Sequence, residues 1–282
     1  MNLSTIGNKI KGNHTMTEGT VYSMLIICGI SHFLNDMIQS IIPSIYPILK
    51  DKFDFSFAQI GIITLIFQMT SSILQPFTGL YADKHPQKTV GINTNISKRA
   101  KYGALAILII LVFSKYFYTS CITSYFTFFL IDKFGISVGA SQLCLFVFLA
   151  AFAIGTVAGG LLGDKFGRKY VIWFSILGSA PFALIMPYTN FVWTIVCTFL
   201  SGLIIASAFS SIVVYATDLM PDKVGLIAGI FFGLMFGLGG LGSAFFGWLA
   251  DKTSIEFIFQ VSAYLPLLGI IAGLLPNTQT RK

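Results

Sequence analysis

Four polar side chains share one face of an otherwise apolar segment near the start of the sequence. His32, Asn35, Asp36 and Gln39 are spaced at i, i+3, i+4 and i+7, which places them on one stripe of a helix. Asp36 is the only acid well inside an apolar stretch, where a carboxylate suits proton coupling or substrate contact. The alternative is a static packing residue satisfied by Asn35 or a neighbouring backbone group. His32 is either a proton carrier or the donor of one hydrogen bond between helices.

Lys115 is the only basic residue inside an apolar stretch. An unpaired ammonium there is costly, so it needs a counter-charge, an anionic substrate or a route to the interface. Asp36 is the candidate counter-charge, and Tyr118 lies on the same helical face as Lys115. Gln68 and Gln75, seven residues apart, share another face. They are expected to line a substrate path or to form hydrogen bonds between helices.

The segments that carry these residues are long enough to cross a bilayer. The chain has 282 residues, 55% of them hydrophobic and only 10% charged, with a mean hydropathy of +0.81. Soluble domains carry about 25% charged residues, so the composition excludes an ordinary soluble enzyme, a disordered chain and a nucleic-acid-binding domain. We expect an all-α polytopic membrane protein whose partner is the lipid bilayer. Eight stretches are predicted to span it: Val21–Leu49, Ala58–Ala82, Gly103–Ile131, Ser141–Gly163, Tyr170–Tyr188, Phe191–Ala216, Val224–Ala250 and Ile255–Leu275.

The sequence lacks the residue patterns of common enzymes. Its four cysteines lie in apolar stretches without CxxC or Cys/His spacing, so neither disulfides nor a metal site is expected. It has no Walker-type GxxxxGK(S/T) motif and no plausible Ser/His/Asp set. We therefore expect no enzyme, no metal and no cofactor. Energy for any transport would come from an ion gradient.

The basic residues predict the orientation of the chain. Thirteen of the 18 lysines and arginines lie on the side of both termini, four lie in the opposite loops, and Lys115 lies inside a span. The positive-inside rule therefore places both termini in the cytoplasm. The N-terminal segment lacks the short apolar region and cleavage site of a signal peptide, so we expect it to stay attached.

Two of the expected cytoplasmic loops repeat one pattern. Gly79–Lys88 and Gly160–Lys169 each begin with glycine, place Asp-Lys four and five residues later, and have lysine at the tenth position. Glycine permits close helix crossing, and the carboxylate can cap a neighbouring helix N-terminus, as a gate would require. Gly247–Lys252 also reads GxxxDK, but on the expected outer side, where we attribute it to chance. The gate residues in the two loops are Gly79, Asp83, Lys84, Lys88, Gly160, Asp164, Lys165, Gly167, Arg168 and Lys169.

Glycine and proline positions predict how the spans pack and bend. A stripe of glycines on the seventh span indicates a packing seam, with gating as a secondary role. Prolines within the apolar stretches are expected to kink or end helices. The residues concerned are Gly229, Gly233, Gly237 and Gly240 for the stripe, and Pro43, Pro76, Pro181 and Pro266 for the bends.

The repeated GxxxD(K/R)xxx(K/R) loop resembles the signature loop of the major facilitator superfamily. Local stretches also resemble its fosmidomycin resistance protein family, namely Ser31–Ser40, Ile60–Gln68, Phe113–Tyr118 and Gly167–Trp173. The superfamily has twelve helices in two halves of six. The match passes from the second helix to the seventh, so helices three to six are missing, with Thr89–Lys101 at the junction. The resemblance implies an incomplete fold: tail 1–20, two helices in 21–88, a linker 89–102, a six-helix half 103–276 and tail 277–282.

The same resemblance implies a function. A working member is a drug efflux antiporter of the bacterial inner membrane, which exchanges protons for drug and confers antibiotic resistance. Asp36 would then serve proton coupling and Lys115 would attract an anionic phosphonate substrate. Asp218 lies where family members carry an acid that partners the signature loop, so we expect it to cap or pair with Asp164 and Lys165.

Two other functions fit the same fold. The shortened chain is alternatively a non-transporting remnant, or a subunit completed by another membrane chain or by further copies of itself. It is also compatible with an uptake carrier for a nutrient or metabolite. No residue pattern that we identify sets the direction of transport.

Overall fold

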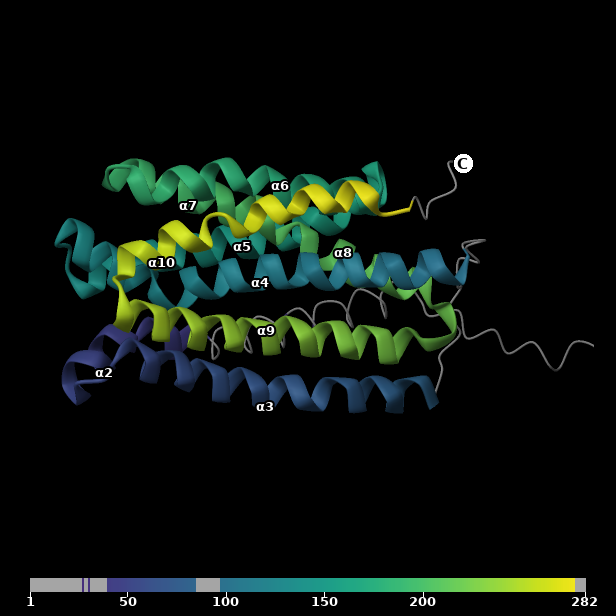
Figure 1. Ribbon diagram of the computed structural model, residues 1–282, viewed down its shortest axis with the longest axis horizontal. Helices are drawn as coiled ribbons and strands as arrows, with labels where there is room; N and C mark the ends of the chain where they lie inside the picture. Colours follow the sequence, from purple (N-terminus) through teal and green to yellow (C-terminus); the bar gives the residue numbers. More distant parts are fainter. Residues whose placement is uncertain (1–26, 28–29, 31–39, 85–96, 277–282) are drawn as a thin grey trace, which may run out of the picture. The chain divides into compact units, whose positions relative to one another are not determined.

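The computed structural model describes residues 40–84 and 97–276, together with Ile27 and Ile30. The described residues from Ser44 onward form one compact unit, built of helices without a strand (Figure 1). Its helices are α2 (Tyr46–Phe53), α3 (Phe57–Lys84), α4 (Lys98–Phe134), α5 (Val138–Phe166), α6 (Arg168–Ile185), α7 (Phe191–Ala206), α8 (Ala208–Leu219), α9 (Val224–Lys252) and α10 (Ile255–Ser262), with 3₁₀ segments at Met186–Tyr188 (η1), Pro221–Lys223 (η2) and Leu265–Leu274 (η3).

Seven segments of the described chain are long and apolar enough to cross a membrane. They match seven of the eight predicted spans, and the all-α polytopic fold is confirmed. The first predicted span, Val21–Leu49, lies mostly outside the described residues. The seven segments are Phe57–Lys84, Lys98–Phe134, Val138–Phe166, Arg168–Tyr188, Phe191–Leu219, Pro221–Lys252 and Ile255–Leu274.

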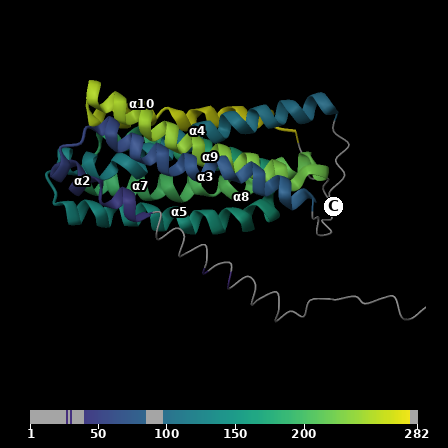
Figure 2. The same cartoon turned by 90° about the horizontal axis from the view of Figure 1, so that it is seen from below.

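Helices α3 and α9 run antiparallel and pack along their whole length (Figures 1 and 2). The predicted glycine stripe of α9 faces α3. A Cβ atom at Gly229 would lie 2.5 Å from the carbonyl oxygen of Gln75, and one at Gly233 would lie 2.9 Å from that of Ser72. Because real Cβ contacts are longer, only glycine permits this approach of the two backbones. We call this contact the α3–α9 seam.

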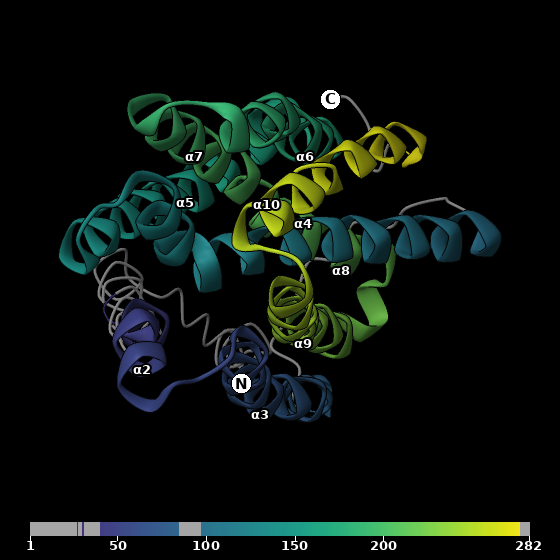
Figure 3. The same ribbon diagram turned by 60° about the vertical axis from the view of Figure 1, so that its left-hand side comes forward.

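Helix α4 forms the centre of the remaining bundle. It contacts α9 on one side and α5, α10 and η3 on others, and much of its second half is buried. Helices α5, α6 and α7 pack against one another, and α6 also packs against η3 (Figure 3). Buried Tyr118 and Tyr125 of α4 direct their hydroxyl groups to Ser201 of α7 and Ser243 of α9. The helix thus connects the seam to the rest of the bundle.

Two spans are interrupted within the bundle. The segment α7–α8 breaks at Ser207, and the last span changes from α10 to η3 across residues 263–264. Pro266 in the first turn of η3 accounts for the second break, because it cannot donate a helical hydrogen bond. Pro76 and Pro181 were expected to kink or end their helices. They do not end them, because α3 and α6 continue through these positions.

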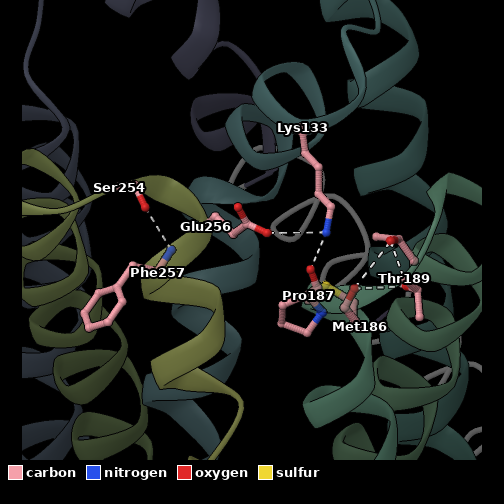
Figure 4. Close-up of polar contacts among 8 residues, drawn as sticks. Lys133, Met186, Pro187, Thr189, Ser254, Glu256 and Phe257 are labelled. Carbon is pink, nitrogen blue, oxygen red and sulfur yellow. Dashed lines mark hydrogen bonds and ion pairs between the residues drawn. The ribbon is translucent and has the colours of Figure 1, made fainter.

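A polar cluster connects three elements at the α10 end of the bundle (Figure 4). Lys133, at the end of α4, donates to the carbonyl oxygen of Pro187 in η1 and lies 3.6 Å from Glu256 of α10. The lysine side chain is 21% exposed, whereas the glutamate side chain is 49% exposed. The more buried backbone contact therefore stabilises this end more than the ion pair does.

We expect Lys133→Met to lower the free energy of unfolding by about 1 kcal/mol, because the carbonyl of Pro187 loses its charged donor. Glu256→Gln should have a smaller effect, since exposed ion pairs contribute little. Thermal unfolding of both variants in the same detergent tests this order. Equal losses would show that the ion pair is the stabilising contact.

Candidate functional site: a buried lysine and the gate contacts

Part of the predicted site lies outside the described residues. This applies to the polar stripe of His32, Asn35, Asp36 and Gln39, and to Lys88 of the first loop. Their predicted roles stay predictions. The other candidate residues are described, and they fall into two regions: the surroundings of Lys115 and the ends of the spans.

Lys115 is completely buried within the bundle. Its ammonium nitrogen lies 3.4 Å from the carbonyl oxygen of Ala206, a long hydrogen bond. It also lies 5.4, 5.4 and 5.6 Å from the ring centres of Tyr116, Phe152 and Phe209. Aromatic faces attract a cation but do not neutralise it. Within the described residues this lysine has no acidic partner within ion-pair distance.

The interruption at Ser207 explains why a carbonyl is available to Lys115. Carbonyl groups at the end of a helix lack a backbone partner four residues later, and inside a bilayer they need another donor. The hydroxyl of Ser175 donates to the carbonyl of Ile205 at 3.1 Å, and Lys115 donates to that of Ala206. Sequence reasoning missed this interruption, because no proline or glycine marks it.

The neighbour of Lys115 on α4 contacts the other interrupted span. The hydroxyl of Ser114 donates to the carbonyl of Leu265 at 2.6 Å, where η3 begins. Tyr118, predicted to share the face of Lys115, hydrogen-bonds to Ser201 of α7 at 3.0 Å. Interrupted helices with free polar backbone groups near a buried charge are a typical way for transporters to build a substrate site.

Gln68 and Gln75 lie on the face of α3 that forms the α3–α9 seam. A Cβ atom at Gly239 would lie 2.9 Å from the side-chain oxygen of Gln68, and one at Gly229 would meet the backbone of Gln75. Both side chains are half-buried. These contacts favour a role of the two glutamines in packing the helices together. Their role in a substrate path stays a prediction.

The first signature loop forms the expected helix cap. One carboxylate oxygen of Asp83 accepts the N–H of Gly225 at 2.7 Å, and the other accepts that of Leu226 at 2.8 Å. Both donors belong to the first turn of α9, where the helix dipole favours a negative charge. A Cβ atom at Gly79 would lie 2.1 Å from the carbonyl oxygen of Gly225. Glycine therefore lets α3 come close enough for Asp83 to reach α9.

The second signature loop forms an ion-pair cluster. Arg168 pairs with Asp218 of α8 and lies 3.8 Å from Asp164, four residues earlier. We expected Asp218 to cap or pair with Asp164 and Lys165; it pairs with the arginine instead, because a guanidinium can contact two carboxylates at once. Gly167 has a φ of 97°, a conformation that favours glycine, and separates α5 from α6.

Gly247–Lys252, which we attributed to chance, has the same structural role as the first loop. The two oxygens of Asp251 accept the N–H groups of Phe57 and Ala58, each at 2.8 Å. The signal was present in the sequence: Gly79–Lys84 and Gly247–Lys252 both read Gly-x-x-Ala-Asp-Lys.

The fold and the site together define a class of protein. It is a polytopic α-helical membrane protein with interrupted spans around a buried cation and a close glycine seam between two antiparallel helices, and this arrangement is that of a membrane transporter.

Comparison with known proteins identifies the family. The model of the Major Facilitator Superfamily matches residues 108–282. The chain belongs to the Major Facilitator Superfamily of transporters. It is 37% identical to the fosmidomycin resistance protein of Escherichia coli K12, over 94% of this chain and 95% of that protein. It is 29% identical to the uncharacterised transporter YfnC of Bacillus subtilis 168, over 92% and 94%, and 27% identical to a probable sugar efflux transporter of Helicobacter pylori J99, over 74% and 52%.

The chain is shorter than its alignment with a full-length relative. The alignment with the fosmidomycin resistance protein runs over 387 positions, more than the 282 residues of this chain. It therefore contains extensive gaps on the side of this chain although it covers nearly all of both proteins. The resemblance inferred from the sequence is confirmed, and the length is consistent with internal truncation.

Proposed function

We propose that this protein is a proton-coupled exporter of a small anionic drug of the fosmidomycin type in the bacterial inner membrane. The observation that carries the proposal is the buried ammonium of Lys115 at the interruption of α7–α8. Within the described residues it has one long hydrogen bond, although an ammonium has three donors. The name of the Escherichia coli relative, a fosmidomycin resistance protein, supports the substrate class.

An anion bound at Lys115 would satisfy the remaining donors and neutralise the buried charge. Both gains depend on burial, because charge interactions strengthen where water is excluded. The rings of Phe152 and Phe209 belong to different helices, α5 and α8, so Lys115 lies where three helices meet. Movement of those helices would change how an anion reaches it.

The remaining predicted roles complete the proposal. Asp36 couples transport to the proton gradient, and its stripe contributes to the substrate path. Asp83 and the Arg168 cluster hold the cytoplasmic gate, with both termini in the cytoplasm. The two-helix segment 21–88 and the six-helix segment 103–276 act as the two moving halves, joined by the linker 89–102.

A susceptibility assay tests the proposal directly. An efflux-deficient bacterial host expressing this protein should tolerate several-fold more fosmidomycin than the same host with empty vector. Asp36→Asn should abolish the difference at matched membrane abundance, because an amide cannot carry the proton. If the wild-type protein reaches the membrane without protecting the host, export of this drug is excluded for this chain.

A second candidate function is a subunit completed by another membrane chain or by a second copy. Two observations favour it: the gaps in the alignment with full-length relatives, and the apolar outer face of α3. On that face Ile66, Ile73 and Phe77 are 63%, 57% and 66% exposed. Resistance that appears only when a second membrane chain is co-expressed would favour this function over the first.

A further inference from the structure

The α3–α9 seam is closed at both ends by the same kind of helix cap. At each end, an aspartate at the end of one helix accepts N–H groups from the start of the other. Asp83 at the end of α3 accepts two N–H groups from the first turn of α9. Asp251 at the end of α9 accepts two N–H groups from the first turn of α3. Because the helices are antiparallel, these two caps lie at opposite ends of the seam.

Each cap depends on a glycine four residues earlier. A Cβ atom at Gly79 would lie 2.1 Å from the carbonyl oxygen of Gly225, and one at Gly247 would lie 2.3 Å from that of Phe57. The glycine brings the backbones together, and the aspartate then reaches the neighbouring helix end. The two ends of the seam are thus built alike, and the shared letters Gly-x-x-Ala-Asp-Lys reflect this common construction.

The cap at Asp251 completes the hydrogen bonding of the start of α3. Ser56 and Gln59 form a capping box, in which the side chain of each accepts the backbone N–H of the other. The two N–H groups between them, those of Phe57 and Ala58, are the ones that Asp251 accepts. If α9 moves away at this end, these two donors lose their protein partner.

A tyrosine of α4 strengthens this end of the seam. The hydroxyl of Tyr125 lies 3.2 Å from the carbonyl oxygen of Phe57 on α3 and 2.7 Å from that of Ser243 on α9. The two helices are therefore connected here by a carboxylate and a hydroxyl. Opening this end would require both contacts to break.

We infer that Asp251 is the gate residue on the expected outer side of the membrane. Asp83 has the same role on the expected cytoplasmic side. The inference rests on the proposed function, since only a transporter needs to open its two sides in turn. Release of Asp251 opens the end of the seam at Phe57 while Asp83 keeps the other end closed. Release of Asp83 does the reverse. Both caps are formed in the structure, so the seam is closed at both ends.

Alkylation of cysteines placed in the seam tests the inference without any substrate. In a background with the four native cysteines replaced by alanine, Ser243→Cys reports on the Asp251 end and Ser72→Cys on the Asp83 side. Ser72 lies against α9, since its hydroxyl donates to the carbonyl of Gly233 at 2.5 Å. Ser243 is fully buried beside the Asp251 end of the seam: its hydroxyl donates to that of Ser124 on α4 at 2.9 Å, and a Cβ atom at Gly61 of α3 would lie 2.5 Å from its carbonyl oxygen. N-ethylmaleimide crosses membranes, so the alkylation rate in membrane vesicles reports water access from either side.

Asp251→Ala is expected to raise the alkylation rate of the Ser243→Cys reporter about tenfold and to lower that of Ser72→Cys, because loss of two charge-assisted hydrogen bonds favours one open side. Asp83→Ala should produce the opposite pattern. Asp251→Asn should give an intermediate rate, since its amide oxygen still accepts one bond. Asp132→Ala, which removes an exposed carboxylate at the end of α4, serves as the control and should change neither rate.

Two results would overturn the inference. If Asp251→Ala raises both reporter rates equally, Asp251 is a static cap whose loss loosens the whole seam. If it changes neither, the cap does not hold the seam closed. Failure of the export proposal is separate: reciprocal alkylation in a protein that does not protect the host leaves the gate intact and removes only the drug-export function.

Discussion

Lys115→Met is expected to return fosmidomycin susceptibility to that of the empty vector while leaving the protein at least as stable as the wild type. Methionine fills a similar volume without the charge. Among the described residues the buried ammonium has one long hydrogen bond, and this contact recovers less free energy than desolvation of the charge costs. Removing the charge should therefore raise or preserve the unfolding temperature. An anionic substrate, in contrast, loses the one fully buried cation among the described residues. Susceptibility and thermal unfolding in detergent measure the two effects.

The matched control for this variant is on the same helix. Lys98→Met removes one exposed charge from the first turn of α4, where Arg99 and Lys101 keep the turn positively charged, and should leave resistance unchanged. Lys115→Arg keeps the charge but needs more room, so it should retain only part of the activity. Full resistance in Lys115→Met would refute a role for the ammonium in binding the anion. Loss of stability together with loss of resistance would assign Lys115 to the structure of the interrupted span.

Gly79→Ala is expected to abolish transport and to lower the free energy of unfolding by about 2 kcal/mol or more. The added methyl group would lie 2.1 Å from the carbonyl oxygen of Gly225, so the backbones of α3 and α9 must separate. Asp83 would then lose its reach to the first turn of α9. Alanine favours helices intrinsically, so any loss of stability reports the steric conflict together with the loss of the Asp83 cap that follows from it.

Gly103→Ala provides the comparison. It makes the same change in a helix, but the added methyl group meets nothing within 4 Å. Higher helix propensity should then leave stability equal or slightly increased, with normal transport. Thermal unfolding of the two variants, beside their drug susceptibility, gives the answer. Similar behaviour of the two would mean that the close approach at Gly79 is not required.

Much of the fold could be predicted from hydropathy alone. The boundaries of seven spans agree with the sequence to within several residues, because apolar length is a direct consequence of bilayer thickness. The interruption at Ser207 could not be predicted in this way. No proline or glycine lies within four residues of Ser207. The freed carbonyls are satisfied by side chains from other helices, such as Ser175.

The gate contacts show a similar division. The role of Asp83 as a helix cap followed from its place after a glycine at a span end, but the helix that it caps did not. Asp251 has the same local pattern and was set aside because it fell on the other side of the membrane. Spacing along one helix does not indicate which neighbour it faces. Asp218 meets the second signature loop as expected, but its partner there is Arg168, not Asp164 or Lys165.

The length of α4 has a consequence for its place in the bilayer. Its 37 residues correspond to about 55 Å of helix at 1.5 Å per residue, against a hydrocarbon core of about 30 Å. Even with a strong tilt, its first turns extend past the acyl chains. Lys98, Arg99 and Lys101 therefore lie at headgroup depth, where anionic phospholipids attract them. The charge of one leaflet, and not only the packing of neighbouring helices, thus helps to fix the height of the helix that holds the buried lysine.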